Sequence, residues 1–353
     1  MRILKKLTAL MLILAFTIQL SACGEKNKTR YEAEFLVLFN TVTKIVAYTE
    51  SKEEFTEYSQ LIYDSLKEYH ELYDIYNNYP GKNNIKTIND NAGIKPIKVD
   101  KKIIDLLLFS KDWYKKTDSK MNIAFGAVLK IWHDYRTEGL EDEESAKIPP
   151  MDKLKEASQH TDINKLKIDE KNSTVYLEDP KMSLDVGAVG KGYATEQVSQ
   201  LAEKKGFKSG LISVGGNIRS IGNKGVDGQL LWNLGIQNPD TESENPTLKL
   251  IYVADKSVVS SGDYERYYTV KGKRYHHIID PITLFPSEYF SAVTIVTHDS
   301  GMADVLSTAI FNMPFEQGNK LIDSLPDTEA LWVMKDGKIK YSKDFEKYLG
   351  SNH

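Results

Sequence analysis

The densest group of residues able to do chemistry is the segment 185–194, which reads DVGAVGKGYA. Flexible backbone at the start of a helix offers unpaired N–H groups to an anion, so glycines here suit a phosphate. The spacing matches neither familiar phosphate loop. A Walker A loop needs a glycine at Asp185 and a hydroxyl at Gly192, and a dinucleotide fingerprint needs the glycine spacings in the reverse order. A tight strand-to-helix turn would use the same glycines, so both interpretations stand.

A carboxylate and a hydroxyl occur at helical spacing further along the chain. Asp304 and Thr308 are at i and i+4 in the predicted helix 300–313, SGMADVLSTAIFNM, so their side chains project from the same face. Hard oxygen donors of this type suit Mg²⁺. A surface-facing acid beside a threonine that packs against the next helix would show the same pattern, and spacing alone favours this plain interpretation.

The N-terminal segment of the chain indicates where the protein works. Arg2, Lys5 and Lys6 precede an apolar run over 7–20, which is typical of a signal peptide and too short to span a bilayer comfortably. The run ends in Leu20-Ser21-Ala22-Cys23, which resembles a bacterial lipobox. That resemblance implies a signal peptide at 1–22, lipidation of Cys23, a tether at 23–30, a domain at 31–350, and export to the outer face of the cytoplasmic membrane, at the cell surface or in a periplasm.

Composition excludes some classes of protein and some bonds. Cys23 is the only cysteine, so the exported domain has no disulfide and no cysteine metal site. The 353 residues carry 46 Lys and Arg against 50 Asp and Glu, a formal charge of −4 with the signs mixed along the chain. This pattern argues against a nucleic-acid partner. The length suits one large domain or two small ones.

The elements that must position these groups are mixed. Apolar periodicity and end signals predict helices at 51–76, from Asp100 to Trp113, at 192–205 and at 300–313. Alternating runs predict strands at 34–50, 210–215, 229–237, 248–255, 266–280 and 291–298, and hairpins at 166–179 and 330–342. The charged stretch 137–147 reads as a surface excursion. Strands in runs of hairpins predict an α+β fold with a mainly antiparallel sheet and flanking helices.

Five segments in order carry a family resemblance. They are DVGAVGKGYA, LISVGGNIRSIG, VVSSGDYERYY, YHHIIDPIT and DSGMADVLSTAIF. Together, from FNTVTKIVAY to the C-terminal hairpin, they resemble the ApbE family of FAD:protein FMN transferases, which are often exported lipoproteins. The resemblance implies a single large ApbE-like, T-fold-like domain. It also implies that FAD is split at its pyrophosphate, that FMN goes to a Thr or Ser hydroxyl of an acceptor protein, and that AMP leaves.

The resemblance also assigns roles to residues. It implies a Mg²⁺ site formed by Asp304, Thr308 and the backbone carbonyl of Ala188, with His277 and Lys191 as catalytic groups. His277 would deprotonate the acceptor hydroxyl or hold the nucleotide, unless it is simply a bonded strand histidine; His276 lies on the other strand face. The implied FAD contacts are Asn40, Tyr76, Asn122, Ile123, Asp185, Lys191, Gly215, Gly216, Gly262, His277 and Ile278.

Several of these assignments have a plain structural alternative. Asp185 could merely cap its turn, the glycines could serve turns only, and Tyr76, the first choice for stacking on a flavin or adenine ring, could be ordinary packing. The chain also departs from the family. Leu284 replaces a glycine after Asp280-Pro281, and Asn122 and Ala124 stand where many members have Asp and Thr. A side-chain contact to FAD from Asn122 is therefore in doubt.

Three functions remain open at this point. The resemblance favours the transferase, with an acceptor flavoprotein subunit of an electron-transport complex as partner. A hydrolase that gives FMN and AMP would use the same site with water as the acceptor. A non-enzymatic flavin- or solute-binding lipoprotein is the third, but solute binders usually have two lobes of alternating helices and parallel strands. SGMAD does not match an SGAT-type acceptor sequence, so the chain reads as the transferase and not as its flavinylated substrate.

Overall fold

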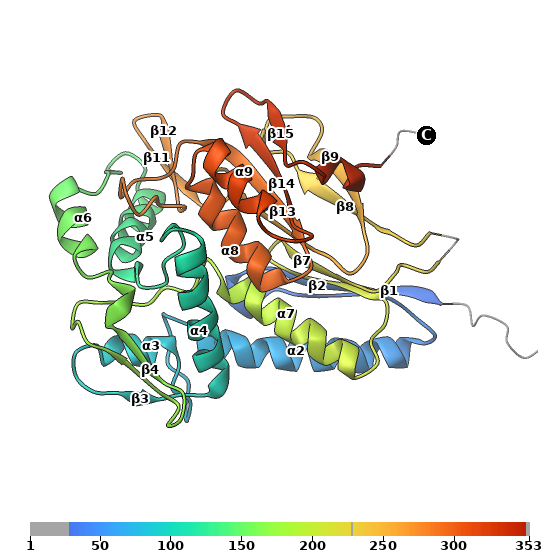
Figure 1. The fold of residues 1–353 in the computed structure, drawn as a ribbon, viewed down its shortest axis with the longest axis horizontal. Coiled ribbons are helices and arrows are strands. Elements are labelled where there is room, and N and C mark those ends of the chain that lie inside the picture. The colour runs from blue at the N-terminus through green and yellow to red at the C-terminus, as the bar shows by residue number, and fades with distance from the viewer. Residues whose placement is uncertain (1–27, 227–228, 351–353) are drawn as a thin grey trace, which may run out of the picture.

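The computed structural model describes residues 28–226 and 229–350, so the predicted signal peptide and Cys23 lie outside the described residues. One antiparallel sheet organises the fold (Figure 1). In spatial order its strands are β1 (Thr29–Phe35), β2 (Thr43–Thr49), β6 (Gly210–Val214), β7 (Asn217–Ile221), β10 (Ser257–Gly262), β13 (Phe290–Thr297), β14 (Glu329–Met334) and β15 (Ile339–Tyr341). The predicted α+β fold with an antiparallel sheet is confirmed.

The remaining elements surround this sheet. The helices are α2 (Lys52–Tyr73), α3 (Ile85–Asp90), α4 (Lys101–Lys116), α5 (Gly126–Glu141), α6 (Met151–Ser158), α7 (Gly190–Lys204), α8 (Ser300–Phe311) and α9 (Phe315–Asp323), with short 3-10 turns η1 (Leu38–Asn40), η2 (Ile163–Lys165) and η3 (Phe345–Tyr348). Smaller sheets are formed by β3 (Ile97–Lys98), β5 (Thr174–Leu177) and β4 (Leu166–Asp169); by β8 (Trp232–Gln237) and β9 (Thr247–Val253); and by β11 (Tyr267–Val270) and β12 (Lys273–His276).

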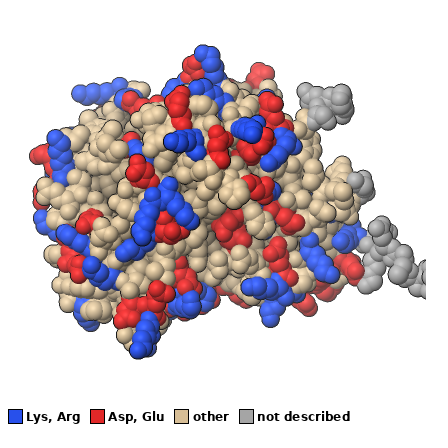
Figure 2. Space-filling view, in the orientation of Figure 1, with Lys and Arg blue, Asp and Glu red and all other residues tan. Residues whose placement is uncertain are grey.

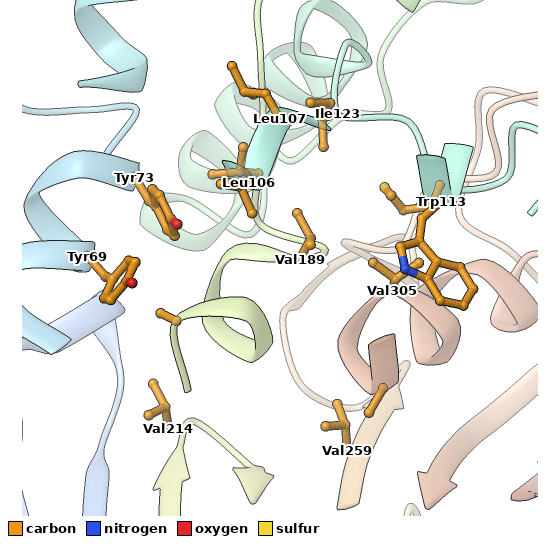
Figure 3. Close-up of a cluster of buried hydrophobic side chains, with 14 of the residues drawn as sticks. Tyr69, Tyr73, Leu106, Leu107, Trp113, Ile123, Val189, Val214, Val259 and Val305 are labelled. Atoms are coloured by element: carbon orange, nitrogen blue, oxygen red, sulfur yellow. The ribbon is translucent and has the colours of Figure 1, made fainter. Parts of the chain in front are cut away.

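The sheet is buried on both faces. Successive side chains of a strand point to opposite faces, and in the central strands apolar side chains point to both. In β13, Val293 and Ile295 join the core beneath α2, α7 and α8, whereas Ala292 and Val296 join a second core beneath the β8–β9 hairpin. Figure 1 shows α2 and α7 side by side along one face of the sheet. Figure 3 shows apolar side chains of α2, α4, α7, α8 and the strands converging in the first core.

Several local predictions hold in detail. Ser51 caps α2 by accepting a hydrogen bond from the Glu54 N–H at 3.1 Å, as the capping-box spacing predicts. The hairpins 166–179 and 330–342 form, and α7 ends before Gly206, which has a φ of +101°. β1 begins at Thr29, so the last two residues of the expected tether 23–30 belong to the sheet.

One stretch in the middle of the chain lies at the surface as expected but has more regular structure than predicted. Most residues of 137–147 are exposed, yet the first half of the stretch is helical and completes α5, which reaches Glu141. Gly139 allows the close approach behind this: a Cβ there would lie 2.6 Å from the Tyr268 ring. α5, α6 and the β11–β12 hairpin share a third core around Trp132 and Tyr268, at one end of the sheet.

The surface of the described domain carries both signs of charge. On the face in Figure 2, Lys and Arg lie interspersed with Asp and Glu, and neither sign of charge gathers into one large patch. Within the described ranges, no helix has the length and apolar character needed to span a bilayer.

Candidate active site

A cavity of about 630 Å³ opens where the main sheet is split. β7 and β10 pair only at Ser257–Arg219 and Val258–Ile218, after which the two strands separate. The cavity, called the seam cavity below, lies in this gap. Its walls are η1, the end of α2, α5, α8 and the glycine-rich segment 185–191, called the glycine loop below. Of the predicted site residues, these line it: Asn40, Tyr76, Asn122, Asp185, Ala188, Lys191, Gly215, Gly216, Gly262, His277, Ile278, Asp304 and Thr308.

Ile123 is the predicted contact that the structure places elsewhere. Its side chain is buried in the main core, and it does not line the seam cavity. Its carbonyl accepts a hydrogen bond from the Asp185 N–H at 2.8 Å. Ile123 therefore supports the glycine loop, and an apolar residue so close to a binding site is accounted for by packing.

The glycine loop is both a tight turn and a wall of the seam cavity. The Asp185 carboxylate accepts a hydrogen bond from the Gly187 N–H at 2.8 Å, and the Gly190 N–H donates to the Val186 carbonyl at 2.7 Å. Asp185 thus closes the turn, as the plain interpretation predicted, and also lines the seam cavity. Burial raises its pKa, and the bond from Gly187 and the charges of nearby cations oppose this rise.

Gly192 explains why the loop ends in Gly-Lys-Gly. Its N–H donates to Asp304 Oδ2 at 2.8 Å, and a Cβ added there would lie 2.2 Å from the Ser300 carbonyl oxygen. Only glycine lets α7 approach α8 this closely. The contact also corrects an expectation: Asp304 is not a surface-facing acid but is 4% exposed.

The oxygen donors expected for Mg²⁺ fit the seam cavity. Asp304 Oδ2 is held by Gly192, while Oδ1 has no hydrogen bond among the described residues and lies 3.8 Å from Lys191 Nζ. Thr308 follows one turn later on α8, and Ala188 lies on the facing loop. The described part of the chain has no group of three His, Cys, Asp or Glu that could hold a metal. A single carboxylate with a hydroxyl and a carbonyl suits Mg²⁺, which completes its coordination with waters and substrate phosphates.

The two neighbouring histidines have separate surroundings. His276 is buried against Phe311, with Nε2 2.8 Å from the Ser287 carbonyl, so it has a structural role. His277 lines the seam cavity, and its buried Nδ1 has no partner within the described residues. Burial, followed by the charge of Arg266, holds the pKa of His277 well below its ordinary value. The imidazole is therefore neutral near pH 7 and able to accept a proton.

Two arginines in the seam cavity were missed by the sequence reasoning. Arg136 from α5 and Arg266 from the loop before β11 both line it, and neither has a carboxylate within ion-pair distance in the described ranges. Arg136 instead contacts His133 Nδ1 at 3.0 Å. Burial and the neighbouring Arg266 lower the pKa of Arg136. Unpaired guanidinium groups in a concave site are suited to phosphate.

The departures from the family pattern have local explanations. Asn122 donates its amide to the Thr161 carbonyl and accepts the Ala124 N–H, both at 2.9 Å, so its side chain holds the loop and leaves only limited capacity for a ligand. Leu284 has a φ of +63°, the left-handed conformation that explains a glycine in the family. Its carbonyl accepts Trp132 Nε1–H at 2.9 Å and its side chain is buried in the third core. Asp280 closes the preceding turn by accepting the Ile282 N–H at 2.8 Å.

The seam cavity thus brings together cationic side chains of a kind suited to phosphate and oxygen donors of a kind suited to a hard cation. Comparison with known proteins agrees: residues 39–332 match the ApbE family, and the chain belongs to that family.

The chain is similar to proteins named FAD:protein FMN transferase. That of Treponema pallidum (strain Nichols) is 34% identical over 270 residues, covering 73% of this chain and 72% of the relative. That of Escherichia coli (strain K12) is 28% identical over 271 residues, covering 74% of each. Among solved structures, the ApbE protein of Thermotoga maritima has a TM-score of 0.79 at 28% identity and covers 91% of this chain and 100% of its own. The flavinyl transferase ApbE of Pseudomonas stutzeri supports the fold, with a TM-score of 0.75 at 19% identity over 94% of this chain and 100% of its own.

Proposed function

We propose that this chain is an FAD:protein FMN transferase that moves FMN from FAD to a Thr or Ser hydroxyl of an acceptor protein and releases AMP, with Mg²⁺ bound. One observation carries the proposal. Oxygen donors of Asp304, Thr308 and Ala188 line the same cavity as Lys191 and two arginines that have no carboxylate partner in the described ranges. A dinucleotide with a pyrophosphate satisfies both sets. Relatives named FAD:protein FMN transferase support the choice of FAD.

The residues of the seam cavity would act as follows. Lys191 and the arginines hold the phosphates, and His277, which is neutral, takes the proton of the acceptor hydroxyl. The hydroxyl oxygen then bonds to the phosphorus of the FMN half, and the bond from that phosphorus to the bridging oxygen breaks. AMP leaves with the bridging oxygen. A bound Mg²⁺ supplies neutralisation of the pyrophosphate charge.

Mass measurement of an acceptor tests the proposal. The chain is incubated with FAD, Mg²⁺ and a flavoprotein subunit of an electron-transport complex, and the acceptor and the released nucleotide are analysed together. We expect the acceptor to gain one FMN group for each AMP released. FMN and AMP formed equally well without acceptor would support the pyrophosphatase instead. Unchanged FAD would support a flavin-binding protein.

Replacing Lys191 by alanine is expected to weaken FAD binding about ten- to a hundredfold, because a charge-assisted hydrogen bond to phosphate contributes about 1.5–3 kcal/mol. Lys191 is 21% exposed, and among the described residues its Nζ has no nearer oxygen than the Gly187 carbonyl at 3.4 Å, so the side chain can turn to a ligand. FMN should lose less affinity, and riboflavin little. The loss should shrink as salt rises.

Titration calorimetry with the three flavins measures this prediction. Lys130→Ala is the matched control, since Lys130 is 71% exposed, pairs with Asp134 and lies outside the seam cavity. Equal losses for riboflavin and FAD would show that Lys191 supports the fold or the ring and not the phosphates.

We also propose that the chain is exported and held at the membrane by lipid on Cys23, on the strength of the lipobox-like sequence. Replacing Cys23 by serine is expected to release the protein from membranes and leave its activity unchanged. The variant lacks the thiol to which the anchoring acyl chains would be attached. Fractionation after a salt wash measures the release. Recovery of the variant with the membranes would contradict the anchor.

A further inference from the structure

The wall of the seam cavity formed by η1 has an unusual backbone. Phe39 has φ +54° and ψ +26°, and Asn40 has φ +52°. Two consecutive non-glycine residues in the left-handed region are strained, and Phe39 is bulky, so the surrounding structure must hold this turn in place. Both residues line the seam cavity. The position of this wall therefore depends on whatever holds the turn.

His70, on the last turns of α2, makes the contact that holds it. The Phe39 N–H donates a hydrogen bond to His70 Nδ1 at 3.2 Å, across a sequence separation of 31 residues. The Phe39 ring meets the imidazole edge-on, with ring centres 5.5 Å apart and planes at 69°. His70 itself lines the seam cavity. One side chain thus binds both the backbone and the ring of the strained residue.

The neighbours of His70 fix its tautomer. The Phe39 N–H can only donate, so Nδ1 must be unprotonated, and a neutral imidazole then carries its proton on Nε2. Nε2 lies 3.4 Å from the Tyr79 hydroxyl oxygen. That hydroxyl donates its own proton to Asp74 Oδ2 at 2.8 Å, so its oxygen is left to accept from Nε2–H. Asp74 is in turn held by the N–H groups of Tyr76 and Asn77.

A proton on Nδ1 would break this chain. The imidazolium would place N–H against the Phe39 N–H, and the bond to the turn would be lost. Burial lowers the pKa of His70, opposed by the charges of Asp74 and Glu71, and Glu71 is ion-paired with Lys82. The Phe39–Asn40 turn contributes no ionisable side chain beside His70, only the apolar Phe39 ring. Neutral His70 is thus maintained down to pH values below about 6.5, its ordinary pKa.

We propose that His70 is a positioning residue for FAD: as the Nε2–H tautomer fixed by Asp74 and Tyr79, it holds the Phe39–Asn40 turn in the conformation that accepts the dinucleotide. This inference rests on the proposed FAD site. It adds a residue that contacts no reacting atom and acts through the turn, and it predicts that FAD affinity falls as His70 becomes protonated.

Two replacements of His70 separate its acceptor from its bulk. His70→Asn leaves an amide oxygen near the position of Nδ1, which accepts the Phe39 N–H and cannot be protonated near neutral pH. His70→Gln moves the amide toward the position of Nε2 and leaves the Phe39 N–H without its acceptor. His298→Asn is the matched control, because His298 is exposed and lies outside the seam cavity. FAD binding to the full chain is measured by calorimetry from about pH 8 to about pH 5, and melting of each variant is recorded.

We expect wild type and His298→Asn to lose up to about tenfold in FAD affinity as His70 becomes protonated toward the acid end, since the part-buried Phe39 N–H is then left without its acceptor. His70→Asn should keep near wild-type affinity at pH 8 and lose little on acidification. His70→Gln should bind about tenfold more weakly throughout, and the rate at saturating FAD should change little in both.

Two results would overturn the inference. One is an acid loss in His70→Asn equal to that of wild type, and the other is equal weakening by Asn and Gln at pH 8. Nitrogen chemical shifts of the His70 ring report the tautomer without FAD, and a proton on Nδ1 at pH 8 would also contradict it, even if a variant does not fold. Absence of FAD binding in wild type would count against the proposed function, whereas the ring measurement would still test the hydrogen-bond chain.

Discussion

Replacing Asp304 by asparagine is expected to reduce FMN transfer at least about a hundredfold at saturating Mg²⁺, while the protein remains folded. The amide oxygen can still accept the Gly192 N–H that Asp304 Oδ2 accepts at 2.8 Å. What it lacks is the negative charge beside Lys191 and the anionic oxygen offered to the cation. The loss should therefore appear in the rate, measured with an acceptor protein, and hardly in the melting temperature.

The alanine variant is a less informative test of the same residue. Asp304 is buried, and removing its carboxylate leaves the Gly192 N–H without a partner, at a cost of about 1–3 kcal/mol. Activity lost in that variant would mix metal binding with the α7–α8 contact. A rate of FMN transfer by Asp304→Asn equal to that of wild type would show that Asp304 is not part of the proposed metal site.

Replacing Gly192 by alanine is expected to lower the free energy of unfolding by about 3 kcal/mol. The new Cβ would lie 2.2 Å from the Ser300 carbonyl oxygen and 2.4 Å from Asp304 Cβ, and neither atom can move without shifting α8. The shift would lengthen the hydrogen bond from Gly192 to Asp304, so the rate of FMN transfer should fall as well. Urea unfolding of the two proteins measures the change in stability.

Gly190 provides the matched control within the same loop. A Cβ at Gly190 would meet its nearest atoms, in Tyr73 and Val186, at 3.5 Å, an ordinary contact distance. Gly190→Ala should therefore change the unfolding free energy by less than about 1 kcal/mol. Equal destabilisation by the two substitutions would mean that flexibility of the loop, and not the approach of α7 to α8, explains its glycines.

The elements that the sequence predicts well are those with local signals. The cap at Ser51, the stop at Gly206 and the hairpins 166–179 and 330–342 each rest on residues a few positions apart. α5 escaped because its sequence runs into a strongly charged stretch, and its stability comes from packing with α6 and the β11–β12 hairpin, far away in the chain. Contacts of that kind leave no periodic trace in one segment.

The candidate site divides in the same way. The family resemblance predicted that Lys191, Asp304 and Thr308 share one site, and all three line the seam cavity. The sequence did not single out Arg136 and Arg266. What distinguishes them is that they line the seam cavity without a carboxylate partner among the described residues, and this is visible only in the three-dimensional structure. The burial of Asp304 was missed for a related reason: it follows from the close approach of α7, which the spacing of Asp304 and Thr308 does not encode.

The pairing of β2 with β6 bears on how the chain reaches its folded state. The two strands are neighbours in the sheet, yet the segment 50–209, with α2 to α7, separates them in sequence. The β1–β2 hairpin closes locally and quickly, but its inner edge must stay open until that whole segment has been synthesised. Contacts of such high order slow folding, and an open strand edge is a template for pairing with other chains. During synthesis this edge is therefore exposed to aggregation for as long as β6 is missing.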